Sequence, residues 1–172
     1  ITPRVYDEQE ALKLSDDKFP LFAKMISGSG STGAQKIENK EELKYFLKKF
    51  PGIILQDFID GQEITVDIFC DKEYNPLVIS PRLRLMTKSG QTTKGKTIDN
   101  KPYVNIIVKI CREIKLVGAC NMQFFVDKNK EIILIEINPR FAAGGLMLTT
   151  EAGANIPLMV IKEILEMPIR QD

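Results

Sequence analysis

Two alternating segments joined by a short polar turn constrain the fold of this chain more than any other feature. Residues 119–127 and 131–138 alternate between polar and apolar side chains, and Asp127-Lys128-Asn129-Lys130 joins them. This period of two predicts an antiparallel β-hairpin in which Gln123 lies across from, or diagonal to, Glu136. The polar side chains then share one face, at the end away from the turn: Asn121, Gln123, Glu136 and Asn138.

The rest of the chain predicts an α+β fold rather than the alternating strands and helices of a parallel sheet. Helices are expected over residues 6–15, from Asn39 to Phe50, from Pro102 onward, and around Pro157. Strands are expected over residues 19–26, 34–37, 53–57, 62–70 and 77–86, with a polar loop over residues 87–99. A boundary near Phe58–Gly61 then separates residues 1–60 from residues 61–172.

The helix after Asn39 carries clear local signals. Asn39 is a favourable N-cap residue, and Glu42 follows three positions later, as in a capping box. Apolar residues then recur at helical spacing: Leu43, Phe46, Leu47 and Phe50. A second apolar stripe predicts the helix near the end of the chain: Leu158, Ile161, Ile164 and Leu165.

Charge and composition exclude several classes of function. The 172 residues include 24 basic and 23 acidic side chains, and a net charge of +1 provides no basic field for nucleic acid or membrane surfaces. Histidine is absent, which removes Ser-His-Asp and Cys-His catalysis and every His-ligated metal site. Acid–base or metal chemistry therefore depends on carboxylates, amides, lysine, tyrosine or cysteine.

The cysteines and the N-terminal residues indicate the compartment in which the protein is expected. Cys70, Cys111 and Cys120 are widely spaced in apolar surroundings, which predicts buried thiols in a reducing compartment. No apolar run approaches the ~18 residues of a membrane span, and no signal-peptide core is visible. We therefore expect a cytoplasmic protein that binds neither membrane nor nucleic acid. Because the chain opens at Ile1 without an initiator methionine, we also expect a piece of a longer protein.

The glycine-rich segment over residues 28–33 matches the pattern G-x-G-x-x-G. A dinucleotide-binding loop of that type opens directly into a helix. Here Ala34 to Ile37 is strand-like, and the next helix begins only after Asn39. The segment is better interpreted as a flap between two strands, whose backbone N–H groups close over phosphates. A solvated hairpin that binds nothing is the alternative.

A second segment, Gly90 to Thr97, matches the P-loop pattern G-x-x-x-x-G-K-[ST]. A phosphate-binding P-loop also opens directly into a helix. The sequence after Thr97 permits no helix before about Pro102, and too little chain follows to build the parallel sheet that such a loop serves. We therefore interpret this segment as a mobile basic loop near a substrate.

The polar face of the predicted hairpin indicates a metal site. A carboxylate and two amides inside an apolar hairpin are costly to bury unless something binds them. Oxygen ligands without histidine suit Mg²⁺, which accepts one or two carboxylates together with waters and substrate phosphates. Arg140 follows the second strand and could hold a phosphate or acyl-phosphate oxygen. A buried ion pair between Glu136 and Arg140 is the alternative.

At these residues the chain resembles the ATP-grasp superfamily, most nearly the ATP-grasp domains of carbamoyl-phosphate synthase large chain and related carboxylate–amine ligases. The likeness runs from about Phe19 to Ile169. Its signatures, in order, are Lys24 with residues 27–33, the stretch from Gln56 to Glu63, Asn121-Met122-Gln123, and Glu136-Ile137-Asn138-Pro139-Arg140. The resemblance implies an α+β ATP-grasp fold, in which two α+β subdomains grip ATP between antiparallel sheets. Residues 1–60 would form the small lid subdomain with the flap, and residues 61–172 the large subdomain with the metal site.

The resemblance implies a role for each matching residue. Lys24 would reach the nucleotide phosphates, and the flap would close over them with Gly28, Ser29, Gly30, Ser31, Thr32 and Gly33. The hinge would meet the adenine with Gln56, Asp57, Phe58 and Ile59, and Glu63 would bind the ribose. One or two Mg²⁺ (or Mn²⁺) ions would be held by Gln123, Glu136 and Asn138. Arg140 would stabilise the transferring phosphoryl group, and Arg84, with Arg82 as a further candidate, would bind phosphate or substrate.

The chain departs from the family pattern at several positions. Met25 stands where a proline usually follows the strand lysine, and the hinge begins with Gln56-Asp57 where Glu-Glu is commoner. Gln123 replaces a second carboxylate, as in the carbamoyl-phosphate synthase branch. We expect that the N-terminal domain that contributes to acceptor specificity in the family lies outside this chain.

The activity that the resemblance implies is an ATP-dependent, ADP-forming ligation. A substrate carboxylate would be activated as an acyl phosphate and then attacked by an amine or another nucleophile. The expected partners are these small molecules and the missing N-terminal domain of the same enzyme, and homo-oligomerisation is left open. The alternative is a nucleotide-binding or regulatory ATP-grasp fragment without independent catalysis.

Overall fold

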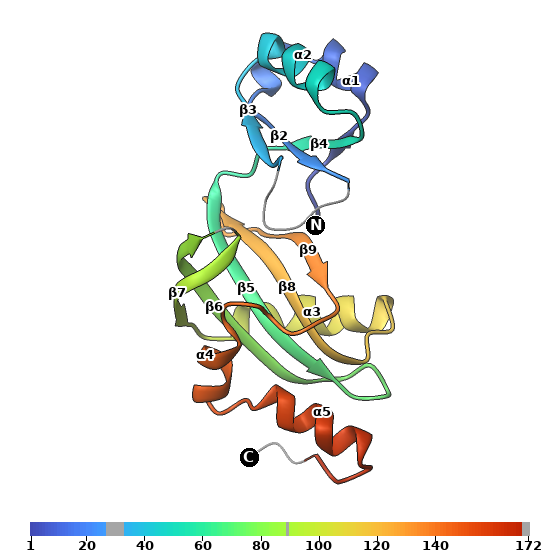
Figure 1. Ribbon diagram of the computed structural model, residues 1–172, viewed down its shortest axis with the longest axis vertical. Coiled ribbons are helices and arrows are strands. Elements are labelled where there is room, and N and C mark those ends of the chain that lie inside the picture. The colour runs from blue at the N-terminus through green and yellow to red at the C-terminus, as the bar shows by residue number, and fades with distance from the viewer. Residues whose placement is uncertain (27–32, 89, 170–172) are drawn as a thin grey trace. The chain divides into compact units, whose positions relative to one another are not determined.

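The computed structural model describes residues 1–26, 33–88 and 90–169. Within these residues the chain divides into two compact units, Ile1–Asp60 and Gly61–Asp172, and each unit has its own antiparallel sheet (Figure 1). The combination of antiparallel sheets with a few helices confirms the predicted α+β class. Gly28, Ser29, Gly30, Ser31 and Thr32 of the predicted flap lie outside the described residues.

The first unit is built on a sheet with the strand order β1-β4-β2-β3, which we call the N-terminal sheet. Its strands are β1 (Val5–Tyr6), β2 (Leu21–Met25), β3 (Gln35–Ile37) and β4 (Ile53–Asp57). Helices α1 (Glu8–Lys13) and α2 (Lys40–Lys49) pack on one face of it, with the short 3₁₀ helix η1 (Asp16–Lys18) between α1 and β2 (Figure 1). Strand and helix side chains share one core: Ala11, Leu21, Ala23, Ile37, Leu43, Phe46 and Leu55.

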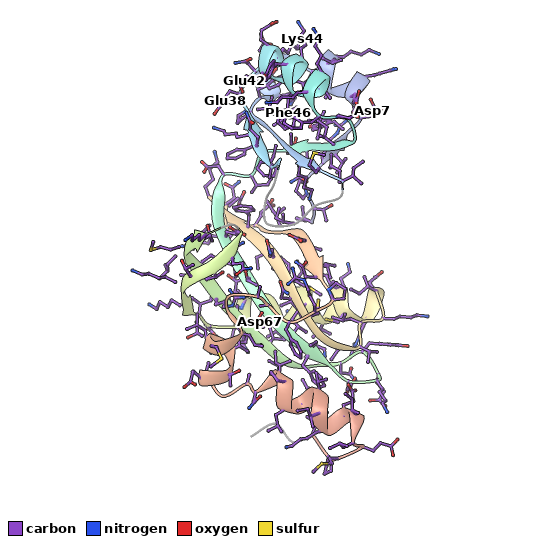
Figure 2. All side chains as sticks on the ribbon, viewed as in Figure 1. Asp7, Glu38, Glu42, Lys44, Phe46 and Asp67 are labelled. Carbon is purple, nitrogen blue, oxygen red and sulfur yellow. The ribbon has the colours of Figure 1, made fainter. Side chains whose placement is uncertain are left out.

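The start of α2 confirms the predicted N-cap. The Asn39 Oδ1 accepts a hydrogen bond of 3.0 Å from the backbone N–H of Glu42. The Glu42 carboxylate accepts in turn from the backbone N–H of Glu38 at 2.8 Å, one residue earlier than in the usual capping box (Figure 2). These bonds satisfy backbone donors that the first turn of a helix leaves without partners.

We expect Asn39→Ala to lower the free energy of unfolding by about 1 kcal/mol, because the variant loses the side-chain acceptor for Glu42 N–H. Urea denaturation of the two proteins measures this difference. Asn39→Ser, which keeps a capping oxygen, is the matched control, and a loss of equal size in both variants would contradict the capping role.

The second unit is built on a sheet with the order β7-β6-β5-β8-β9, which we call the C-terminal sheet. Its strands are β5 (Gly61–Cys70), β6 (Pro76–Lys88), β7 (Gln91–Thr97), β8 (Gly118–Asp127) and β9 (Ile132–Asn138). Helix α3 (Lys101–Glu113) covers one face, over a core that includes Ile64, Val66, Ile107 and Met122. Helices α4 (Leu146–Glu151) and α5 (Ile156–Ile164) follow β9, and Ile156 packs against Phe69 and Val78 on the other face. In the described residues, no helix has the length and apolar character needed to cross a membrane.

The predicted polar loop over residues 87–99 is wrong. Strand β6 continues to Lys88, and β7 pairs with it from Lys88 opposite Gln91 to Arg82 opposite Thr97. Strand β7 lies at the edge of the sheet, where backbone pairing suffices and exposed lysines such as Lys94 and Lys96 are common. The P-loop match therefore lies largely on a strand, which supports its rejection. Likewise Gln35–Ile37 is a strand, and no helix opens directly on Gly33.

Helix α5 confirms the predicted C-terminal helix, with Pro157 in its first turn. Its predicted apolar stripe does not face the core, because Leu158, Ile161 and Ile164 are 44%, 53% and 74% exposed. The residues that pack toward the sheet are Ile156, Met159 and Val160. Helix α5 carries apolar side chains on two faces. Their spacing therefore predicts the helix correctly but does not show which of the two faces is buried.

Candidate functional site

One face of the C-terminal sheet collects the polar residues that the sequence singled out. Gln123 lies directly opposite Glu136, one of the two arrangements predicted for the hairpin, and Asn121 lies directly opposite Asn138. A register shift between Gln123 and Phe124 produces this pairing. Thr65 pairs with Gln123 on one side and with Arg82 on the other, so β5 and β6 extend the same face. This polar face carries Glu63, Thr65, Asp67, Arg82, Arg84, Asn121, Gln123, Glu136 and Asn138.

Arg84 is the cation at the centre of the polar face. It forms an ion pair with Glu63, and its side chain is 7% exposed. Its guanidinium also donates to the Gln123 Oε1 at 3.5 Å and to the Gly90 carbonyl at 2.5 Å. The Nε atom of Arg84 is buried without a partner among the described residues. The structure thus brings three predicted ligand residues, Glu63, Arg84 and Gln123, into direct contact.

Two polar groups near the end of β9, the Glu136 carboxylate and the Asn138 Nδ2 atom, have no partner among the described residues. The Glu136 side chain is exposed and forms no ion pair within the described ranges, so the alternative pairing of Glu136 with Arg140 is not formed. Arg140 instead donates to the Asn138 Oδ1 at 3.3 Å and to the Phe141 carbonyl at 3.1 Å. The Nδ2 atom of Asn138 is buried and unpartnered in the described part of the chain. A bound group at this position would satisfy polar atoms that the protein itself does not.

The donor set fits a hard divalent cation. It comprises one free carboxylate, Glu136, with the amides Gln123 and Asn138 on paired strands. Among the residues that the structure describes, no group of three or more His, Cys, Asp or Glu side chains could hold a metal ion. Such a carboxylate-poor oxygen set suits Mg²⁺, which keeps waters and substrate oxygens in its coordination shell.

The cysteines play no part in this site. Cys70, Cys111 and Cys120 are free and buried in the core beneath α3. Burial raises the pKa of the Cys120 thiol to about 12. A hydrogen bond with Cys111, and then burial, raise the pKa of Cys70. Because the thiolate is the nucleophilic form, the raised pKa values disfavour nucleophilic chemistry at Cys70 and Cys120.

Three of the predicted nucleotide residues of the first unit, Lys24, Gln56 and Asp57, lie on strands of the N-terminal sheet, and Phe58 and Ile59 follow β4 outside the sheet. Lys24 on β2 and Gln56 on β4 share the face of this sheet that is opposite the helices. Lys24 pairs with Ile54, and Phe22, two residues before Lys24 and on the same face, pairs with Gln56. Lys36 places its Nζ atom 4.8 Å from the centre of the Phe58 ring. The structure therefore holds Lys24 and the start of the hinge on neighbouring strands.

Sequence reasoning missed the residue that fixes the start of this hinge. The Tyr6 hydroxyl donates to the Asp57 Oδ1 at 2.6 Å, across the β1–β4 pair. Burial and the hydrogen bond to Asp57 raise the pKa of Tyr6 to about 12. A lone tyrosine 51 positions upstream offers no sequence signal for this contact.

The raised pKa of Tyr6 predicts that the stability of the folded protein depends on pH. An unfolded tyrosine has a pKa near 10, whereas the folded value is about 12. The stabilisation from Tyr6 is therefore complete below pH 10 and is lost as the pH rises from 10 to 12. Tyr6→Phe should cost about 1.5–3 kcal/mol at pH 7 and lose less stability than wild type between pH 10 and 12. Urea denaturation across this range measures the difference, and parallel pH profiles would contradict it.

Comparisons with known proteins identify the family of this chain. A family model described as "ATP-grasp in the biosynthetic pathway with Ter operon" matches residues 49–172. A D-alanine--D-alanine ligase from Aquifex aeolicus (strain VF5) is 26% identical over 143 residues, which cover 76% of this chain and 49% of the relative. The carbamoyl phosphate synthase large chain of Clostridium acetobutylicum is 27% identical over 160 residues, covering 83% of this chain and 15% of the relative. The chain thus spans about half the length of the D-alanine--D-alanine ligase.

Solved structures share the fold. Biotin carboxylase from Campylobacter jejuni, in complex with β,γ-ATP, superposes with a TM-score of 0.82 at 20% identity and covers 99% of this chain and 44% of its own. The biotin carboxylase domain of the 2-oxoglutarate carboxylase from Hydrogenobacter thermophilus, in complex with MgADP, ADP and bicarbonate, has a TM-score of 0.80 at 21% identity. It covers 99% of this chain and 43% of its own. At this identity the likeness concerns the fold alone.

Proposed function

This chain belongs to the ATP-grasp family, and from that premise we propose that it binds MgATP and activates a substrate carboxylate for attack by an amine or another nucleophile. The observation that carries the proposal is the polar face of the C-terminal sheet. It sets the free carboxylate of Glu136 directly opposite Gln123 and close in register to the Arg84–Glu63 pair. The relatives named as D-alanine--D-alanine ligase and carbamoyl phosphate synthase support a carboxylate–amine ligation.

The proposed metal ligands are Gln123, Glu136 and Asn138, which would hold Mg²⁺ or Mn²⁺. The metal would neutralise charge on the transferring phosphate when bound. Arg140 and Arg84 would contact the phosphoryl oxygens with guanidinium groups, which match their planar geometry. Arg84 is already oriented by Glu63 and Gln123, so its direction does not depend on the ligand.

The nucleotide contacts are proposed for residues of both units. Lys24 would neutralise phosphate charge, and the segment from Gly28 to Gly33 would donate backbone N–H groups to the phosphates. The hinge residues Gln56, Asp57, Phe58 and Ile59 would meet the adenine. Glu63 would accept from the ribose hydroxyls while it keeps its contact with Arg84.

The proposed reaction runs in two displacements. A carboxylate oxygen of the substrate attacks the γ-phosphorus, the bond to the β–γ bridging oxygen breaks, and ADP leaves with that electron pair. A nucleophile then attacks the acyl carbon, and inorganic phosphate leaves. The side chains position the reactants and neutralise charge, which is the main protein contribution to phosphoryl transfer. We further propose an acceptor like that of carbamoyl-phosphate synthase, because Gln123 stands in place of a second carboxylate, as in the carbamoyl-phosphate synthase branch of the family.

Calorimetric titration with ATP tests the nucleotide proposal. Binding is expected in the presence of MgCl₂, with much weaker binding in EDTA. Absence of binding in both conditions would refute it. The alternative is a nucleotide-binding module without its own catalysis, and an assay of acceptor-dependent ADP release distinguishes it from a ligase. If the protein binds MgATP but releases no ADP with any carboxylate–amine pair, the result favours the module.

A further inference from the structure

We propose that the buried Asp67–Arg82 pair is a positioning device that fixes the segment from Arg140 to Thr149 on the polar face, so that Arg140 meets the transferring phosphoryl group. This inference rests on the proposed function. It also changes the role of Arg82, which the sequence suggested as a further ligand residue. We call residues 140–149 the crossing segment.

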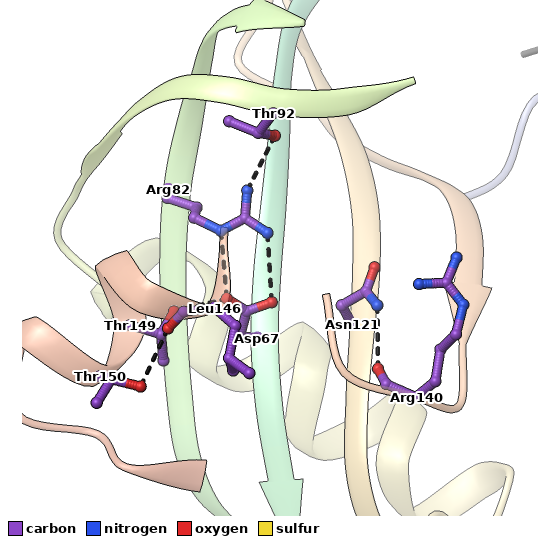
Figure 3. A network of polar contacts seen from close by, with 8 residues as sticks. All are labelled: Asp67, Arg82, Thr92, Asn121, Arg140, Leu146, Thr149 and Thr150. Atoms are coloured by element: carbon purple, nitrogen blue, oxygen red, sulfur yellow. Dashed lines mark hydrogen bonds and ion pairs between the residues drawn. The ribbon is translucent and has the colours of Figure 1, made fainter. Parts of the chain in front are cut away.

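The pair is sealed from solvent. The Arg82 Nε lies 3.2 Å from the Asp67 Oδ2, and the Arg82 Nη2 lies 3.4 Å from the Asp67 Oδ1 (Figure 3). Both side chains are 2% exposed. Arg82 therefore has almost no surface to offer a ligand.

Two hydroxyl groups connect the pair to neighbouring elements. The Thr149 Oγ1 donates to the Asp67 Oδ2 at 2.6 Å, and Thr149 is fully buried. The Arg82 Nη1 donates to the Thr92 Oγ1 at 3.2 Å. The network thus links α4, at the end of the crossing segment, to β5, β6 and β7 (Figure 3).

The crossing segment lies directly on this network. A Cβ atom at Gly145 would lie 2.0 Å from the Arg82 Cζ, and one at Gly144 would lie 2.4 Å from the Thr92 carbonyl oxygen. No real Cβ contact is this short, so Gly145 allows the backbone to approach the guanidinium and Gly144 allows it to approach the backbone of Thr92 on β7. The close approach explains why consecutive glycines occur at this point of the chain.

The other end of the crossing segment is also held. The Asn121 Nδ2 donates to the Arg140 carbonyl at 3.1 Å (Figure 3). Arg140 therefore begins a stretch that is anchored to β8 at its start and to the Asp67–Arg82 pair at its end. Replacing a buried ion pair with apolar side chains is often neutral or stabilising, so such a pair is weak support for stability alone. Its hydrogen-bond geometry is suited to defining a unique backbone position.

The metal ligands lie on β8 and β9, outside the Asp67–Arg82 network. Loosening the network should therefore leave MgADP binding intact and weaken only the contacts that Arg140 makes to a transferring phosphoryl group. Aluminium fluoride with MgADP mimics that group. The gain in MgADP affinity on adding aluminium fluoride measures those contacts, whereas a purely structural role for the network would leave the gain unchanged in the folded protein.

The test compares Thr149→Val, which removes the donor to Asp67, with Thr149→Ser, which keeps it. Thr150→Val is the matched control, because among the residues that the structure describes the Thr150 hydroxyl bonds the Leu146 carbonyl of its own helix and no other group. We expect Thr149→Val to bind MgADP within about twofold of wild type and to reduce the aluminium fluoride gain at least about tenfold. Thr149→Ser and Thr150→Val should keep the gain.

The outcomes separate the inference from the proposed function. If wild type binds no MgADP, or shows no gain with aluminium fluoride, the proposed function fails and the inference fails with it. If wild type shows the gain and Thr149→Val keeps it, the inference alone is overturned. Should Thr149→Val fail to fold, Thr92→Val, which removes the acceptor of Arg82 Nη1, is measured in the same way.

Discussion

Glu136→Gln is expected to lower the affinity for MgATP by at least about 100-fold, because it removes the sole carboxylate of the proposed metal set. The variant keeps the shape of the side chain, and Glu136 is exposed without a partner in the described residues. Its unfolding free energy should therefore match that of wild type. Calorimetric titration with ATP in MgCl₂ measures the affinity, and the same titration in EDTA should show no difference between the two proteins.

Glu131→Gln provides the matched control for this experiment. Glu131 is also exposed and precedes the same strand, β9, but it lies at the turn end of the hairpin. Equal losses in the two variants would indicate a general charge effect rather than metal ligation. An unchanged affinity in Glu136→Gln would remove the proposed metal site altogether.

Asp67→Leu is expected to lower the free energy of unfolding by about 3–5 kcal/mol, because it leaves the Arg82 guanidinium charged and buried without its partner. Removing both charges, in Asp67→Leu with Arg82→Met, should recover most of this loss, since the uncompensated charge is then absent. Chemical denaturation of the single and double variants measures both steps.

The Arg84–Glu63 pair supplies an internal comparison. Glu63 is 31% exposed at its side chain, so water can reach Arg84 when Glu63 is replaced by alanine. Glu63→Ala should therefore cost clearly less than Asp67→Leu. Equal costs, or a loss below about 1 kcal/mol in Asp67→Leu, would mean that the buried pair is not held as tightly as its geometry implies.

The local features of the fold were predictable because they depend on neighbours along the chain. The N-cap of α2 requires an acceptor at Asn39 and a backbone donor three residues later. The β8–β9 hairpin requires alternation and a short turn, which are both visible in the sequence. A register shift between Gln123 and Phe124, which the sequence does not show, then sets Gln123 directly opposite Glu136. The edge strand β7 was missed, because a polar segment at a sheet edge needs only backbone partners.

Two contacts in the sites depend on residues far apart in sequence. Tyr6 holds Asp57 from 51 residues away, and Thr149 reaches Asp67 from 82 residues away. Neither threonine nor tyrosine carries a local pattern that marks such a partner. These contacts become visible only when the strands and helices are placed together.

Arg82 and Arg84 show which properties of a residue the sequence determines and which depend on the tertiary structure. The sequence by itself determined that both arginines lie on one face of one strand, and that Gln123, Glu136 and Asn138 share one face of a hairpin. Only the tertiary structure decided that Arg82 is buried beneath Gly145 and paired with Asp67, while Arg84 contacts both Glu63 and Gln123. The physical reason is that strand periodicity sets the direction of a side chain, whereas burial and charge pairing depend on which distant segment covers it.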